Sequence, residues 1–151
     1  MDEATRKQII SIIDDVDDMT IATVRADKFP QATTVSYVND GLTIYFGTFV
    51  DSQKARNIAA NNRVSLTINR DYKNWDEIEG LSLAGRAKPV LGGEERDKVE
   101  RLITEKFPQG NQYMPEGANP EDMIIFRIDP EVISLLDYRR EFGHTKLVGV
   151  P

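Results

Sequence analysis

Apolar residues at helical spacing mark three segments of the chain. In residues 2–18 they fall three and four positions apart, which gives a helix one apolar face to bury against a sheet. The same spacing predicts a helix that begins at Ser52 and ends at 61–62, and another over 94–107, which Pro108 stops. The apolar faces are Ile9, Ile12, Ile13 and Val16 in the first helix, Ala55, Ile58 and Ala59 in the second, and Val99, Leu102, Ile103 and Phe107 in the third.

Alternating and β-branched segments between these helices predict about seven strands. Because the strands come in runs and do not alternate one by one with helices, the order is typical of an antiparallel barrel with peripheral helices. Gly85, inside the fifth strand, predicts a bend or a β-bulge. The strand segments are 19–25, 31–38, 42–46, 63–69, 81–89, 123–128 and 132–138.

Turn residues connect these elements. Asp40-Gly41, between the second and third strands, is typical of a tight hairpin, and a type I′ turn is expected there. Gly47-Thr48 is expected to form a corner that ends the third strand. Residues 108–122 contain three prolines and two glycines, which predicts a long loop of the kind that forms lids or interfaces.

Charge and composition narrow the class of protein. The 151 residues suit a single domain spanning 1–151. Asp and Glu number 25 against 19 Lys and Arg, and the net charge of −6 disfavours a nucleic acid partner. The absence of cysteine excludes disulfides, thiolate metal sites and thiol nucleophiles. No segment approaches the roughly 18 apolar residues of a membrane span, so a soluble, cytoplasmic protein without a membrane partner is expected.

Segment 42–61 has the features of a phosphate-binding site. A strand followed by a helix that begins with Ser52 and Lys54 offers an anion free backbone N–H groups, the positive end of the helix dipole and an ammonium group. The spacing of a Walker loop is absent, which disfavours nucleoside triphosphate chemistry. Asp51 would repel an anion unless its carboxylate turns away or caps the helix.

The hairpin, the sequence Phe46-Gly47-Thr48, the sequence Ser52-Gln53-Lys54 and the strand 63–68 resemble one known family. They are similar to the FMN-binding split-barrel proteins related to pyridoxamine 5′-phosphate oxidase, and the likeness covers most of the chain. The resemblance implies a mainly β (α+β) fold, a six- to seven-stranded antiparallel split β-barrel with peripheral helices. It also implies a homodimer with FMN at the subunit interface.

The same resemblance implies which residues bind the cofactor. The isoalloxazine would lie along the second strand, the ribityl chain would border the third, and the start of the helix would hold the phosphate. By position these residues are Thr33, Thr34 and Val35, then Phe46, Gly47 and Thr48, then Ser52, Gln53 and Lys54. The alternative for Ser52 and Lys54 is an N-cap and a solvated lysine, and for Thr33 and Thr34 it is an ordinary strand position.

The implied activity is that of an oxidoreductase that passes electrons or hydride between a donor and a small acceptor through FMN, without a dedicated catalytic side chain. Oxidation of vitamin B6 is disfavoured, because those oxidases usually have arginines in place of Thr33 and Gln53, and their tail differs from Leu147-Val148-Gly149-Val150-Pro151. Two alternatives stay open: a flavin-binding electron carrier without substrate turnover, and a split barrel that uses F420 or haem.

The other candidate residues each have two interpretations. Trp75 closes a barrel end or a subunit contact, or it stacks on a cofactor. His144, the single imidazole, is structural or solvated, or it acts as a general acid or a haem ligand. Two acidic groups are interpreted as solvated surface, and no metal site is predicted. They are Asp76, Glu77 and Glu79 in one group, and Asp14, Asp15, Asp17 and Asp18 in the other.

Overall fold

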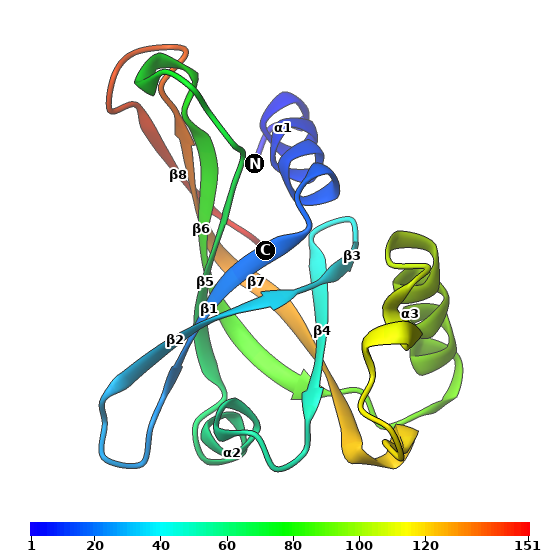
Figure 1. Ribbon diagram of the computed structural model, residues 1–151. Helices are drawn as coiled ribbons and strands as arrows, with labels where there is room; N and C mark the ends of the chain where they lie inside the picture. The colour runs from blue at the N-terminus through cyan, green and yellow to red at the C-terminus, as the bar shows by residue number, and fades with distance from the viewer.

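All strands of the protein lie in one antiparallel sheet, in a computed structural model that describes residues 1–151 (Figure 1). The strand order is β2-β1-β5-β6-β7-β4-β3, and β8 pairs with β7 beside this path. The strands are β1 (Asp18–Val24), β2 (Pro30–Ser36), β3 (Val38–Asp40), β4 (Thr43–Phe49), β5 (Arg63–Asn69), β6 (Glu79–Pro89), β7 (Met123–Asp137) and β8 (Thr145–Gly149). The helices are α1 (Glu3–Asp15), α2 (Gln53–Ala60) and α3 (Gly93–Lys106).

The sheet curls into a split barrel, as expected from the sequence. Its two ends, β2 and β3, belong to one run of chain that is interrupted only at Tyr37. Because β2 pairs with β1 while β3 pairs with β4, this run joins the two ends of the sheet. No ladder joins β2 to β4, and the two strands diverge there (Figure 1). This divergence is the split of the barrel.

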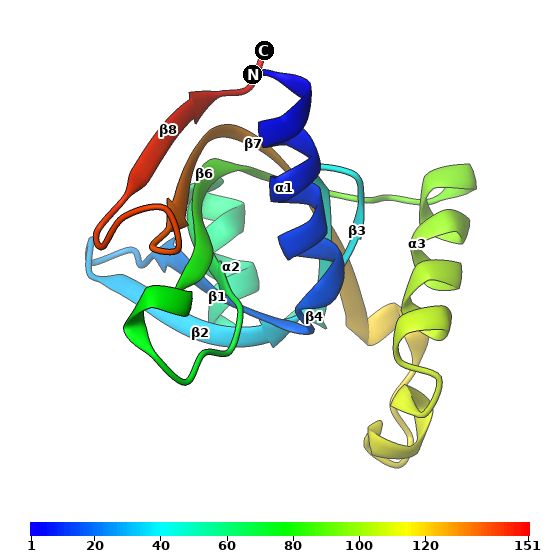
Figure 2. The ribbon, with the colours of Figure 1, turned by 90° about the horizontal axis from the view of Figure 1, so that it is seen from above.

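Helices cover the two ends of the barrel, and the third lies outside it. Figure 2 shows α1 over the opening of the ring of strands, and Figure 1 shows α2 at the opposite end. α1 begins at Asp2, whose carboxylate accepts the Thr5 amide at 2.7 Å, and it buries Ile9, Ile12 and Ile13 in the main core. α3 packs separately, through Val99, on the outer face of the strands. None of the helices is long and apolar enough to cross a membrane.

Several expected boundaries are wrong. The third strand does not end at a Gly47-Thr48 corner, because both residues pair with β7 and the strand continues to Phe49. Segments 123–128 and 132–138 form the single strand β7, and β8 lies in a segment with no expected strand. Ala59, expected on the buried face of α2, is exposed.

The two expectations about glycines differ in outcome. The Asp40-Gly41 hairpin is confirmed. Asp40 pairs with Thr43, so the two loop residues are Gly41 and Leu42, and of these only Gly41 has a positive φ, of 59°. This combination fits a type II′ turn and not the expected type I′. The bulge at Gly85 is confirmed by a register shift between Ala84 and Gly85. A Cβ at Gly85 would lie 2.6 Å from the carbonyl oxygen of Asp129, so the close approach of β6 and β7 requires glycine.

Candidate functional site

The candidate site lies where β2 and β4 diverge, above α2 (Figure 1). A cleft of about 190 Å³ opens there between the 36–38 segment, the middle of β4 and the end of α3. It adjoins a cavity of about 500 Å³ that α3 and residues 111–120 cover from outside. Both are lined by Gly47, Ile103 and Met123. The outer face of β4 is therefore accessible at Gly47.

Tyr37 and Lys106 fix the position of the split. The Tyr37 hydroxyl donates to the Ile13 carbonyl at 2.6 Å, and burial together with nearby carboxylates raises the pKa of this phenol. Lys106 places its Nζ 4.0 Å from the centre of the Tyr37 ring and donates to the carbonyl oxygens of Val16 and Tyr37. Burial lowers the pKa of Lys106. These contacts join the ends of α1 and α3 to the residue where the strand changes partner.

On β4, side chains alternate between the barrel interior and the outside. Phe46 is 2% exposed and stacks on Phe126, with ring centroids 5.5 Å apart, so its side chain belongs to the core. Gly47 faces the cleft. Thr48 is buried and donates to the Ser52 hydroxyl at 3.1 Å. Of these three positions, Gly47 offers an outward surface, and Thr48 connects the strand to the start of α2.

On β2, Thr34 points outward and its neighbours point inward. Thr33 and Val35 are half-buried, and Val35 packs against the main core. Thr34 is exposed and lies opposite Thr20 of β1. A ligand on the outside of the barrel would therefore meet the Thr34 side chain and the β2 backbone, while the Thr33 and Val35 side chains support the strand from within.

The first turn of α2 has the features of an anion site. Ser52 is the N-cap, with its hydroxyl oxygen accepting the Ala55 amide at 3.2 Å and the Thr48 hydroxyl, which leaves its own proton free to donate. The amides of Gln53 and Lys54 have no acceptor within the chain. Lys54 is half-buried and makes no ion pair or hydrogen bond. Ser52 is thus an N-cap, which was the alternative stated for it from the sequence, and its free hydroxyl proton lies on the same first turn as the unpaired Lys54.

Gln53, itself exposed, belongs to a hydrogen-bond network centred on the buried Asn57 that the sequence did not reveal. Its amide nitrogen donates to Asn57 at 2.7 Å, and Asn57, 3% exposed, donates to Thr23 and Gln31 at 3.0 Å each. Thr23 and Gln31 face each other across β1 and β2. The signal in the sequence was a polar residue, Asn57, between the buried Ala55 and Ile58. Asn57 therefore fixes α2 to the strand pair that includes β2.

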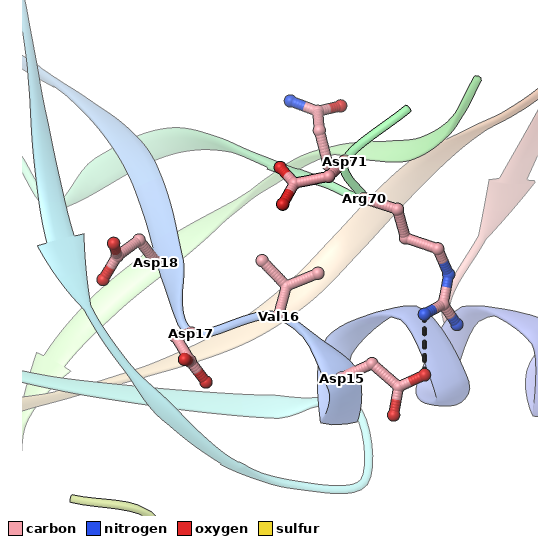
Figure 3. Close-up of a pocket in the computed structure, with 7 residues that line it drawn as sticks. Asp15, Val16, Asp17, Asp18, Arg70 and Asp71 are labelled. Carbon is pink, nitrogen blue, oxygen red and sulfur yellow. Dashed lines mark hydrogen bonds and ion pairs between the residues drawn. The ribbon is translucent and has the colours of Figure 1, made fainter. Parts of the chain in front are cut away.

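Carboxylates gather elsewhere, around a pocket of about 560 Å³ at the junction of α1, β1 and β5. Figure 3 shows Asp15, Asp17 and Asp18 spread around Val16, with Asp15 turned toward Arg70. Arg70 binds Asp15 at 2.6 Å, and no group of His, Cys, Asp or Glu side chains is arranged to hold a metal ion. The pocket has the character of solvated surface with one ion pair.

Glu79 corrects the interpretation of 76–79 as a solvated group of carboxylates. Asp76 and Glu77 are exposed, but Glu79 is 6% exposed and pairs with Arg70 at 2.7 Å and with Arg139. The residue belongs to β6, where its side chain faces the end of the barrel beneath α1. A strand that begins two residues earlier than expected brings Glu79 under the helix.

The β5–β6 loop, which carries Trp75, and the β7–β8 loop, which carries His144, lie side by side at the end of the barrel away from α2 (Figure 1). Trp75 is exposed and stacks on Phe142, with ring centroids 6.0 Å apart. His144 is half-buried in the β7–β8 turn, where its backbone carbonyl accepts the Asp137 amide. Within one chain, neither loop reaches the first turn of α2.

Comparisons with known proteins agree with this architecture. General stress protein 26 of Bacillus subtilis (strain 168) is 26% identical over 132 residues, which cover 87% of this chain and 88% of that protein. A conserved hypothetical protein from Mycobacterium tuberculosis superposes with a TM-score of 0.76 at 26% identity, over 99% of this chain and 93% of the other. A haem binding protein from Mycobacterium smegmatis superposes with a TM-score of 0.79 at 16% identity, over 99% of this chain and 58% of its own.

A family model matches the chain over a region that includes the whole candidate site. The pattern described as pyridoxamine 5′-phosphate oxidase matches residues 5–137, from α1 to the end of β7. That match includes the diverging strands, the Ser52 cap and Lys54. The chain belongs to the pyridoxamine 5′-phosphate oxidase family.

Proposed function

We propose that the protein is a homodimeric FMN-binding oxidoreductase of the pyridoxamine 5′-phosphate oxidase-like type. The observation that carries this proposal is Lys54: a half-buried lysine whose ammonium group has no partner, at the start of a helix whose first amides are also free. A cation in that position is suited to a ligand phosphate. Membership of the family supports FMN as the molecule that provides it.

The donors at the start of α2 fit a phosphate monoester. Lys54 supplies charge, the Ser52 hydroxyl has its proton free, and the amides of Gln53 and Lys54 supply directed N–H groups. Asp51, the neighbour expected to repel an anion, is exposed and leaves the capping role to Ser52. Its carboxylate can therefore remain in water while the phosphate approaches from the helix axis.

The strands next to the split fit the rest of the cofactor. Gly47 leaves the outer face of β4 open, and Thr34 carries its hydroxyl outward on β2. Bound flavin supplies the redox chemistry, while the polypeptide orients the ring and restricts access to it. Thr34 and the β2 backbone would hold the ring edge through hydrogen bonds, and Phe46 and Val35 would keep both strands in place from the core.

The outer face of the sheet supports a dimer. Two rows of paired residues cross the sheet from β2 through β1, β5, β6 and β7 to β8, and neither row contains a charged side chain. They are Thr34, Thr20, Thr67, Ser82, Ser134 and Leu147 in one row, and Ala32, Ala22, Ser65, Ala84, Val132 and Gly149 in the other. No helix of the same chain covers this face (Figure 2). An outer face of mainly small, uncharged residues suits contact with a second copy better than contact with water.

Haem is the second candidate ligand, because one similar structure is named as a haem binding protein and His144 is half-buried. The β7–β8 turn that carries His144 lies at the opposite end of the barrel from α2 (Figure 1). A haem bound through His144 would therefore leave Lys54 of the same chain unused. FMN accounts for more of the observed site.

The absorption spectrum of the protein as purified, and again after incubation with FMN, tests the proposal. Bands of oxidised flavin with one FMN per chain are expected. A Soret band that weakens when His144 is substituted would identify haem, and not FMN, as the ligand. A colourless protein that cannot be reconstituted with FMN would overturn the proposal. Anaerobic addition of NADH or NADPH then separates an oxidoreductase, whose flavin bands bleach and recover with an acceptor, from a carrier without turnover.

A further inference from the structure

Arg56 turns back along α2 toward the start of the helix. The residue is exposed on the second turn, yet one guanidinium nitrogen donates to the Asp51 carbonyl and another donates to the Gln53 side-chain oxygen at 3.1 Å. Both acceptors belong to the beginning of the helix. The positive charge of Arg56 therefore lies beside the first turn, where it remains exposed.

The Gln53 side chain, which accepts a hydrogen bond from Arg56, is itself held by a second hydrogen bond. Gln53 donates its amide nitrogen to Asn57 at 2.7 Å, and this bond directs its oxygen toward Arg56. Asn57 in turn is buried and donates to Thr23 and Gln31 on the paired strands β1 and β2. A chain of hydrogen bonds thus runs from the barrel wall through Asn57 and Gln53 to the guanidinium.

Two cations at this end of the helix, Lys54 and Arg56, favour an anion with two negative charges, and the neighbouring Asp51 carboxylate is exposed. Arg56 forms no ion pair with a carboxylate, and neither does Lys54. A phosphate monoester near neutral pH carries close to two negative charges, of which Lys54 balances one. Guanidinium groups bind phosphate oxygens through directed N–H groups, and Arg56 retains N–H groups beyond the two in use.

We propose that Arg56 is the second cation of the phosphate site, and that Gln53 is a positioning residue that orients Arg56, with Asn57 holding Gln53. This inference rests on the proposed FMN function and changes one of its residue roles. Gln53, expected from the sequence to hold the phosphate, acts through Arg56 instead. Through Asn57 and Gln53, the same hydrogen bonds connect Gln31 of β2, two residues before Thr33, to the proposed phosphate site.

Titration of FMN and of riboflavin, followed by flavin fluorescence, tests these roles. Riboflavin has the same ring and ribityl chain without the phosphate, so it reports on structural damage. Arg56→Gln is expected to weaken FMN binding about tenfold and to leave riboflavin binding unchanged. Gln53→Ala is expected to weaken FMN binding by a smaller factor. Arg63→Gln, an exposed arginine just after the helix, is the matched control and should match the unaltered protein.

The double variant separates positioning from direct contact. If Gln53 acts through Arg56, adding Gln53→Ala to Arg56→Gln causes no further loss of FMN affinity. Additive losses would overturn the positioning role of Gln53. Unchanged FMN affinity in Arg56→Gln, or equal losses for FMN and riboflavin, would overturn the role of Arg56 while the FMN proposal stands. Absence of FMN binding by the unaltered protein would overturn both.

Discussion

Glu79 and Asp137 lie directly opposite each other on β6 and β7, and both carboxylates are buried beneath α1. The Gln8 amide of α1 donates to both, at 2.9 and 2.8 Å. Arg139 pairs with both as well, and Arg70 adds a third contact to Glu79. Two like charges coexist there because each has a cation and a neutral donor. The network fastens α1 to the end of the barrel.

Replacing Asp137 is expected to change how stability depends on pH. Arg139 and Gln8 lower the pKa of Asp137 from 3.8 to about 2, so the folded protein binds fewer protons than the unfolded chain between these values. The stabilisation is complete above about pH 4 and is lost as pH falls through about 2. Asp137→Asn should cost about 1–3 kcal/mol at pH 7 and give a shallower loss of stability in this acid range. Urea unfolding at several pH values measures both effects.

A nearby carboxylate provides the control for Asp137. Asp76 is exposed on the 3-10 turn Trp75–Glu77, and Asp76→Asn should change the free energy of unfolding by less than about 0.5 kcal/mol. If Asp137→Asn unfolds at the same urea concentration as the unaltered protein at pH 7, the network does not stabilise α1 on the barrel.

Gly85→Ala should destabilise the protein by about 1–3 kcal/mol. The added methyl group would lie 2.6 Å from the Asp129 carbonyl oxygen, and this contact is with backbone, so the bulge between β6 and β7 must shift. Gly110→Ala is the control, because the nearest atom to its added carbon, the Phe107 Cβ, would lie 3.9 Å away. Thermal unfolding of both variants compares them, and equal midpoints would mean that the bulge tolerates a side chain.

Phe46→Ala should lower the free energy of unfolding by about 3–5 kcal/mol, because the Phe46 ring is buried against Phe126. Phe49, on the same strand, is 37% exposed, and Phe49→Ala should cost less than about 1 kcal/mol. Chemical denaturation measures both variants. A Phe46 variant with normal stability and lost flavin binding would give its side chain a direct cofactor role instead.

Periodicity along the chain was sufficient to predict the helices and most strands. The alternation of Val64, Leu66 and Ile68 places β5 correctly over Arg63–Asn69, and Ser52 is the N-cap of α2. These features are local, because a strand face or a helix cap is set by residues a few positions apart. The fold class followed from their order along the chain, whereas the family followed from the resemblance of Phe46-Gly47-Thr48 and Ser52-Gln53-Lys54 to known motifs, which the match over residues 5–137 confirms.

Features that depend on contacts between distant segments could not be predicted in this way. Pro130 predicts the end of a strand, yet β7 continues through it: Pro130 lies opposite Gly85, next to a bulge in which Glu131 of β7 is the extra residue. Glu79 looks solvated until α1 and Arg139 cover it. Asn57 gains its partners from β1 and β2, more than twenty residues earlier in the chain.

Thr67→Arg should weaken the proposed dimer. Thr67 is exposed near the middle of the uncharged rows, so an arginine there would introduce charge and bulk into a contact between small side chains. Light scattering during gel filtration is expected to show a shift from dimer toward monomer. Thr104→Arg, exposed on α3, should leave the mass unchanged. Dimers of equal stability in both variants would place the interface on another surface.

Lys54→Ala should weaken FMN binding by about ten- to a hundredfold, because a charge-assisted contact to phosphate contributes on the order of 1.5–3 kcal/mol. Its half-buried position and lack of any partner mean that little stability is lost with it. Lys73→Ala, an exposed lysine at the other end of the barrel, is the control. Fluorescence titration at low and moderate salt should show a weaker salt dependence for Lys54→Ala, because one fewer cation meets the phosphate. Unchanged affinity would make Lys54 a solvated helix residue and would remove the main support for a phosphate at α2.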